Sequence, residues 1–230
     1  MRAGPSVPPL PPPVACASDP AGPTDSGPAP PPYPDPMHLT GNITSDRPLL
    51  VLAVAEEAQY LDTTLPVLLT GMGKVNAATA LAAALAGGPL PSEVVNLGTA
   101  GALRPGWHGT HLVGTVVQHD LDSDTLRTLT GETYGAPLTT ADPDGPVLAT
   151  GDSFIADEAD RLRLAEHASL VDMEGYALAA AAHRAGVPIR IVKHVSDDAD
   201  ESAARTWRET VGECARALAD WAAHHIPAYA

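Results

Sequence analysis

The chain alternates short apolar runs with longer segments in which apolar residues recur at helical spacing. Continuous runs such as Leu49–Val54 and Ile189–Val195 are typical of strands buried on both faces of a parallel sheet. Ala-rich segments such as Lys74–Ala86 and Glu174–Ala185 fit helices, and a glycine follows each of them. This alternation predicts an α/β sandwich around a mixed or mostly parallel sheet.

The same patterns give the bounds of the expected elements. We expect strands at Leu49–Val54, Pro66–Thr70, Glu93–Leu97, His111–Val117, Val147–Ala149, Leu170–Asp172 and Ile189–Val195. We expect helices at Lys74–Ala86, Ala156–His167, Glu174–Ala185 and Glu201–His224. No internal repeat is visible, so one domain accounts for these elements.

The first part of the chain has a different composition. Pro, Ala, Gly and Ser dominate residues 1–36, in runs such as Pro11–Pro13 and Pro30–Pro32. We expect residues 1–46 to be a disordered Pro/Ala-rich tail without a signal peptide, and residues 47–230 to form the domain. One hypothesis is that Met37 is the natural start. The intact mass of protein made from the native gene tests it, and a dominant species containing the tail would defeat it.

Charge and cysteine content exclude several classes of partner. The 230 residues carry a formal charge of −15 with a sequence pI near 4.7, and Lys and Arg form no block, so we expect no nucleic-acid partner. The apolar runs are too short to span a membrane. The two cysteines, Cys16 and Cys214, form no disulfide framework, which suggests a cytoplasmic protein. No Cys/His ligand set exists, so we expect neither a metal nor an organic cofactor.

Polar or glycine-rich groups follow most of the expected strands. Because the carboxyl ends of parallel strands meet at one edge of a sheet, these groups predict a ligand crevice there. They are Glu56-Glu57, Gly71–Lys74, Gly98–Gly101, His119-Asp120, Asp172–Glu174 and Ser196-Asp197.

Two acidic groups near this rim could divide the work of a reaction. The group Asp172-Met173-Glu174 opens an apolar helix, and Asp197 ends a strand. One acid could grip hydroxyls as a carboxylate while the other keeps a proton to donate, which suits cleavage of a glycosidic bond. The other motifs favour structural interpretations. His119-Asp120 fits a polar loop or subunit contact better than an acid–base pair, and Lys193 fits a structural ion pair or a place at the rim.

Five motifs in sequence order resemble the nucleoside phosphorylase/nucleosidase superfamily, and the nearest branch is 5′-methylthioadenosine/S-adenosylhomocysteine nucleosidase. They are Thr70–Ala78, Asn96–Gly101, Ala149–Phe154, Asp172–Glu174 and Val195–Asp197. The resemblance spans about residues 48–224. It implies a three-layer α/β/α fold, a homodimer, and hydrolysis of the N-glycosidic bond of a purine nucleoside with release of adenine.

The resemblance also implies catalytic roles. Asp197 would protonate N7 of the leaving base, and Ser196 would orient that acid. Glu174 would hold the ribose 2′- and 3′-hydroxyls, with Met173 packed against the sugar. Glu57 would activate the attacking water.

The remaining roles concern substrate binding. Phe154 would stack on the base, and backbone groups near Ile155 would read its edge. Thr70 and Gly71 would line the ribose and water side. Trp207 would form an aromatic lid over the 5′ group.

The nucleophile and the substrate leave alternatives open. Related phosphorylases carry an arginine at the position of Asn96 and a Gly-rich loop where this chain has the acidic Ala55-Glu56-Glu57, so we expect water rather than phosphate to attack. A phosphorolytic enzyme remains the first alternative. The segment between Glu57 and Thr70 is short for the family and Asp172 replaces a common glutamate, so a futalosine-type hydrolase and a non-catalytic nucleoside-binding protein remain alternatives as well.

Overall fold

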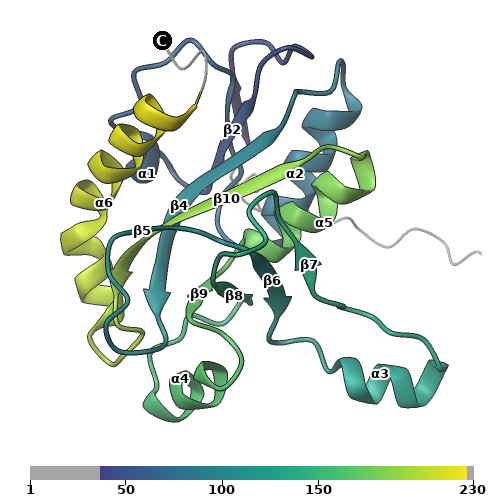
Figure 1. The fold of residues 1–230 in the computed structure, drawn as a ribbon, viewed down its shortest axis with the longest axis vertical. Coiled ribbons are helices and arrows are strands. Elements are labelled where there is room, and N and C mark those ends of the chain that lie inside the picture. Colours follow the sequence, from purple (N-terminus) through teal and green to yellow (C-terminus); the bar gives the residue numbers. More distant parts are fainter. Residues whose placement is uncertain (1–36, 227–230) are drawn as a thin grey trace, which may run out of the picture. The chain divides into compact units, whose positions relative to one another are not determined.

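The computed structural model describes residues 37–226, which fold into a mixed α/β structure (Figure 1). The strands are β1 His38–Thr40, β2 Leu49–Leu52, β3 Val67–Leu69, β4 Val94–Ala102, β5 Thr110–Leu112, β6 Thr115–Gln118, β7 Leu138–Thr139, β8 Val147–Thr150, β9 Leu170–Asp172 and β10 Ile189–Asp197. The helices are α1 Ala55–Ala58, α2 Lys74–Ala86, α3 Ser123–Thr130, α4 Glu158–Ala165, α5 Gly175–Ala185 and α6 Ala203–His225.

Within residues 37–226 the strands form one ten-stranded sheet in the order β1-β3-β2-β4-β9-β8-β6-β7, with β10 paired to β4 and β5. The pairs β2·β3, β2·β4, β4·β10, β6·β8 and β8·β9 are parallel. The pairs β1·β3, β4·β9, β5·β10 and β6·β7 are antiparallel. The expected mixed sheet is therefore confirmed.

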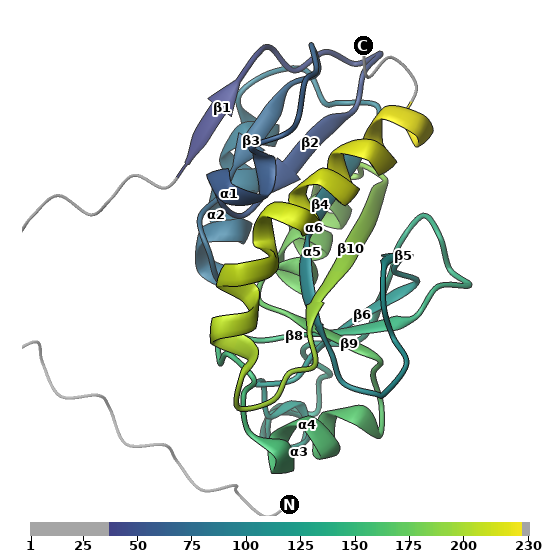
Figure 2. The same cartoon turned by 90° about the vertical axis from the view of Figure 1, so that its left-hand side faces the viewer.

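Helices cover both faces of the sheet, as the three-layer expectation requires (Figures 1 and 2). Helices α2 and α5 pack on one face through small and aliphatic residues such as Ala77, Leu81 and Leu178. Helix α6 packs on the other face, where Leu218 and Ala222 meet Leu97 and Val192 of the central strands. Burial of these aliphatic side chains contributes about 25 cal/mol per Å² of apolar surface removed from water.

The central strands differ from expectation at their ends. The motif Gly98–Gly101 was expected to be a turn after a strand, but it lies inside β4. The reason is parallel pairing with β10, which continues along the motif as far as Gly101. Close packing explains the glycines, because a Cβ at Gly98 would lie 3.0 Å from the Lys193 ammonium and one at Gly101 would lie 3.0 Å from Asp197 Oδ1. Glycine here lets side chains approach a flat strand, and no turn is needed.

Two other predictions from the sequence pattern are wrong. The apolar run His111–Val117 is not one strand, because it breaks between β5 and β6 at Gly114, where a Cβ would lie 2.5 Å from the carbonyl oxygen of Gly145. The domain also begins before residue 47, since β1 pairs with β3 in antiparallel register. Residues 1–36 of the expected tail lie outside the described residues.

Candidate active site

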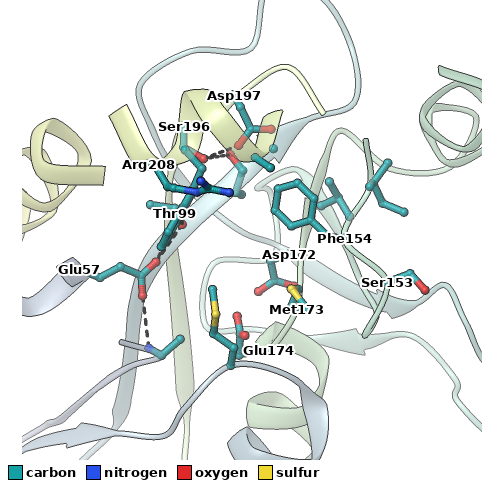
Figure 3. Close-up of a pocket in the computed structure, with 18 residues that line it drawn as sticks. Glu57, Thr99, Ser153, Phe154, Asp172, Met173, Glu174, Ser196, Asp197 and Arg208 are labelled. Atoms are coloured by element: carbon teal, nitrogen blue, oxygen red, sulfur yellow. Dashed lines mark hydrogen bonds between the residues drawn. The ribbon is translucent and has the colours of Figure 1, made fainter. Parts of the chain in front are cut away.

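A cavity of about 230 Å³ lies where β4 and β10 end, between α1, α6 and the segment that leads into α5 (Figure 3). Residues from the ends of six strands or the loops after them line it, together with α1 and the first turns of α6. They are Ala53, Glu57, Met72, Thr99, Ala100, Gly101, Ser153, Phe154, Ile155, Val171, Asp172, Met173, Glu174, Ser196, Asp197, Ala204, Trp207 and Arg208. The expected crevice at the carboxyl rim of the sheet therefore exists in the structure.

Most of the residues proposed from the sequence meet in this cavity. Lining it are Glu57, Phe154, Ile155, Met173, Glu174, Ser196, Asp197 and Trp207. Thr70 and Gly71 do not line it. Thr70 is buried and its Oγ1 donates a hydrogen bond of 2.8 Å to the Gly71 carbonyl oxygen, so both shape the turn that presents Met72.

Asp197 is held firmly at the end of β10. The register between β10 and β4 shifts between Val195 and Asp197. The Ser196 hydroxyl donates to Asp197 Oδ2 at 2.7 Å, and the Ala199 N–H donates to Oδ1 at 2.9 Å. Burial raises the pKa of Asp197 above its usual range, although both hydrogen bonds oppose the shift and the charges of Asp198 and Asp200 add to it. The buried position thus shifts this carboxyl toward its protonated form.

Glu57 lies on the opposite wall, in the short helix α1. Its neighbour Glu56 faces solvent, but Glu57 is buried. Glu57 Oε1 accepts hydrogen bonds from Thr99 N–H at 2.8 Å and Thr99 Oγ1 at 2.9 Å, while Oε2 accepts a longer bond of 3.3 Å from Ala53 N–H. The Trp207 indole N–H donates to Thr99 Oγ1 at 3.0 Å, which ties α6 to the same wall.

Glu174 forms the floor of the cavity together with a buried ion pair. Glu174 is the N-cap residue of α5, and its Oε1 accepts a 2.8 Å hydrogen bond from Gly73 N–H. Asp172 Oδ2 lies 2.9 Å from the Lys193 ammonium, and Asp172 Oδ1 accepts a 2.6 Å bond from Thr150 Oγ1. The structural ion pair expected for Lys193 is therefore confirmed.

Burial and neighbouring charges shift the pKa of both Glu174 and Lys193 in this cluster. Burial first, and then the charge of Asp172, raise the pKa of Glu174 to about 8, against the opposing effects of Lys193 and the Gly73 N–H. Burial alone would lower the pKa of Lys193, but the surrounding carboxylates, with Asp172 foremost, raise it. Lys193 therefore stays charged, and Glu174 holds a proton at neutral pH when the cavity is empty.

Phe154 stands on a loop after β8 that a polar network holds in place. Lys74 at the start of α2 pairs with Asp120 and donates a 2.9 Å hydrogen bond to Gln118 Oε1. Asp152 accepts a 2.8 Å bond from the Lys74 N–H, and its own N–H donates to Asp120 Oδ2 at 2.9 Å. His119 and Asp120 do not line the cavity, so the expected loop role for this pair agrees with the structure.

This arrangement combines a buried acid, an acceptor carboxylate and a carboxyl floor around an exposed aromatic ring. A family model described as the phosphorylase superfamily matches residues 57–145 and 144–227. The chain belongs to the phosphorylase superfamily. Its relatives include the 5′-methylthioadenosine/S-adenosylhomocysteine nucleosidase of Staphylococcus carnosus, which is 30% identical over 206 residues, covering 79% of this chain and 90% of the relative. The nucleosidase of the same name from an Exiguobacterium species is 31% identical over 161 residues, covering 60% and 69%.

Two solved structures from Helicobacter pylori share the fold. A mutant of the Helicobacter pylori nucleosidase with 5′-methylthioadenosine in its active site gives a TM-score of 0.69 at 19% identity, covering 79% of this chain and 98% of that one. Futalosine hydrolase of Helicobacter pylori gives 0.67 at 20% identity, covering 77% and 95%. The sequence-based resemblance to this superfamily is thus confirmed, as is the fold.

Sequence reasoning about this phosphorylase-superfamily site missed Thr99 and Arg208. Thr99 donates twice to Glu57, but a threonine between Gly98 and Ala100 gives no signal of its own in the sequence. Arg208 lines the cavity one residue after Trp207. The i, i+3, i+4 spacing of Ala204, Trp207 and Arg208 places them on one helix face, which could have pointed to it.

No helix within residues 37–226 combines the length and apolar character needed to cross a bilayer. Over the same residues, no group of three or more His, Cys, Asp or Glu side chains is arranged to hold a metal ion.

Proposed function

We propose that the chain hydrolyses the N-glycosidic bond of a 5′-substituted purine nucleoside of the 5′-methylthioadenosine or S-adenosylhomocysteine type, releasing adenine. The observation that carries the proposal is that Asp197, Glu174 and Glu57 line one cavity together with Phe154. The names of the relatives add independent support.

Asp197 is the proposed general acid. Expulsion of an anionic purine is slow, and a proton placed on N7 turns the base into a neutral leaving group. General acid catalysis of this kind contributes about 10²–10⁴-fold to the rate. The raised pKa of Asp197 supports this role because the acid must still hold its proton near neutral pH. The Ser196 hydroxyl and the Ala199 N–H each engage one oxygen of the carboxyl, which supports a fixed orientation toward the base.

Glu174 is the proposed ligand of the ribose 2′- and 3′-hydroxyls. A carboxylate can accept hydrogen bonds from both hydroxyls, and its charge would stabilise the positive charge that develops on the sugar as the bond breaks. The burial of Glu174 at the floor, with Met173 beside it in Figure 3, supports this placement. Sugar hydroxyls that donate to the ionised form would favour loss of the proton that Glu174 holds in the empty cavity.

Glu57 is the proposed base for the attacking water. Its Oε2 accepts only the longer bond from Ala53 N–H, so this oxygen keeps the capacity to accept a proton from water. Glu57 and Thr99 lie on the side of the cavity across from Phe154 in Figure 3. A general base on that side and a general acid at the other end of the cavity suit displacement of the purine by water.

The charges around the cavity favour water over phosphate as the nucleophile. Among the described lining residues, the acidic ones are Glu57, Asp172, Glu174 and Asp197. Lys193 is 1% exposed and already pairs with Asp172, so it is not free to bind an anion. Arg208 also lines the cavity, but it is exposed at the mouth, so a phosphate in the place of the attacking water would lie beside Glu57 without a second arginine to hold it.

Release of base from a nucleoside panel with and without phosphate tests the proposal. We expect adenine from 5′-methylthioadenosine at a rate that does not change with phosphate. Strict dependence of adenine release on phosphate would show a phosphorylase and refute the hydrolase. Binding of adenine without any turnover of the panel would replace it by a non-catalytic nucleoside-binding protein.

We also propose that the chain acts as a homodimer. A groove between α2 and α5 is lined by small apolar residues such as Ala78, Ala177 and Ala181, and Val75 at its edge is 71% exposed. Such a face suits close packing of a second copy. Light scattering after size exclusion should give twice the chain mass for the wild type and the chain mass for Val75→Glu. A monomeric wild type would refute the dimer.

The proposed location is the cytoplasm, and its support is the cysteine usage of the sequence. Cys214 of α6 is buried and carries a free thiol, which suits a reducing compartment. Fractionation of the native host tests this, and recovery of the protein outside the cytoplasm would contradict it.

A further inference from the structure

Arg208 is the one cationic side chain among the described residues that line the cavity. It lies in the second turn of α6, on the same face as Ala204 and Trp207. In Figure 3 its guanidinium extends from the α6 wall past Thr99 and Ser196 toward the space in front of Phe154. Arg208 is exposed, so it stands at the mouth of the cavity while the acids lie inside.

The acidic side chains inside the cavity have partners other than Arg208. Asp172 pairs with Lys193, and Glu57 accepts three hydrogen bonds from Thr99 and Ala53. Asp197 accepts hydrogen bonds from Ser196 Oγ and Ala199 N–H, and Glu174 accepts one from Gly73 N–H. Within residues 37–226 no hydrogen bond or ion pair joins Arg208 to any of them. Its charge is therefore available to a ligand.

The orientation of a bound nucleoside decides which part of it meets Arg208. On the proposed function, the base points to Asp197 and Phe154, and the 2′- and 3′-hydroxyls point to Glu174 on the floor. The 5′ carbon then carries the substituent that is free to leave toward solvent, and Arg208 stands at that exit.

We propose that Arg208 binds a carboxylate at the end of the 5′ substituent, so that the preferred substrates are purine nucleosides with an anionic 5′ side chain. A guanidinium presents paired N–H donors that match the two oxygens of a carboxylate, and a charged partner strengthens such bonds. This inference rests on the proposed nucleosidase function and narrows its substrate class. Because the contact is made equally before and during bond cleavage, it acts on KM and leaves the chemical step alone.

The test compares two probes that differ only in charge: a 5′-(carboxyalkylthio)adenosine and its primary amide. We expect the wild type to favour the acid by about 10-fold in kcat/KM, which corresponds to roughly 1.4 kcal/mol for a charge-assisted contact at a partly exposed site. In Arg208→Gln the ratio of acid to amide should fall to about 1. Arg205→Gln is the matched control, since Arg205 is exposed on the same helix but does not line the cavity, and it should keep the ratio of about 10.

Three results would overturn the inference. They are equal use of the acid and the amide by the wild type, a preference that survives in Arg208→Gln, and a preference that Arg205→Gln removes as well. Hydrolysis of 5′-methylthioadenosine without any Arg208-dependent ratio would leave the proposed function standing and refute this inference alone. If neither probe is hydrolysed, calorimetric binding of the same two probes to wild type and Arg208→Gln gives the ratio directly, and equal affinities would refute it.

Discussion

Replacement of Glu174 by glutamine should change how the stability of the protein depends on pH. Glu174 is buried on the cavity floor, and its pKa lies at about 8 in the folded chain against 4.5 for an ordinary glutamate. Between those values the folded state holds a proton that the unfolded state has lost. The free energy of unfolding must therefore fall as pH rises through this window.

The size of the effect follows from the two pKa values. Linkage with a folded pKa of about 8 gives a loss of about 3 kcal/mol between about pH 6 and about pH 9, because each pH unit below the folded pKa contributes about 1.4 kcal/mol. Glutamine cannot titrate, so Glu174→Gln should lack this loss. It keeps an oxygen that can accept the hydrogen bond from Gly73 N–H.

Urea unfolding of wild type and Glu174→Gln at both pH values measures the difference. Other titrating groups, such as His119 and His194, are common to both proteins and cancel in the comparison. We expect the wild type to lose about 3 kcal/mol more than the variant on going to the higher pH. Equal losses in the two proteins would refute the account of Glu174 as a protonated side chain in the empty cavity.

Three further predictions concern turnover. Asp197→Asn should lower kcat/KM for 5′-methylthioadenosine by about 10²–10⁴-fold with an unchanged circular dichroism spectrum, since an amide cannot donate the proton; near-normal turnover would remove Asp197 from the acid role. Gly101→Ala places a Cβ 3.0 Å from Asp197 Oδ1 and should lower kcat/KM about 10-fold, whereas Gly88→Ala, with no atom within 4 Å, should not; equal effects of the two would contradict the packing argument. Lys74→Met removes the ion pair that holds the Phe154 loop, so KM should rise about 2- to 5-fold with little change in kcat, as expected for a partly exposed ion pair. An unchanged KM, or a similar rise in KM for Arg127→Met at an exposed ion pair, would count against the loop's role.

The pattern of apolar residues predicted the strands and helices well where one element buries one continuous face. Lys74–Ala86 and Leu170–Asp172 appear in the structure with the predicted bounds. The pattern failed where long-range packing sets the conformation. The glycines of Gly98–Gly101 look like a turn in sequence, but they lie in a strand because β10 pairs with them, and glycine leaves room for Lys193 and Asp197.

The site shows the same division. The residue types of Asp197 and Glu174 at strand and helix ends suggested their chemistry, and the structure brings both side chains to one cavity. Glu56 and Glu57 are equivalent in sequence, and only the direction of the short helix α1 separates an exposed side chain from a buried one. The position of Arg208 at the mouth depends on where α6 crosses the sheet, which its own residues do not encode.

The nucleophile is the part of the account that one experiment can settle most directly. Reaction of 5′-methylthioadenosine in ¹⁸O-labelled water without phosphate should release adenine and leave one labelled oxygen at C1 of the sugar. Adenine release only when phosphate is added, with a sugar phosphate as the product and no label at C1, would contradict the claim that Asp197, Glu174 and Glu57 form a water-using nucleosidase site.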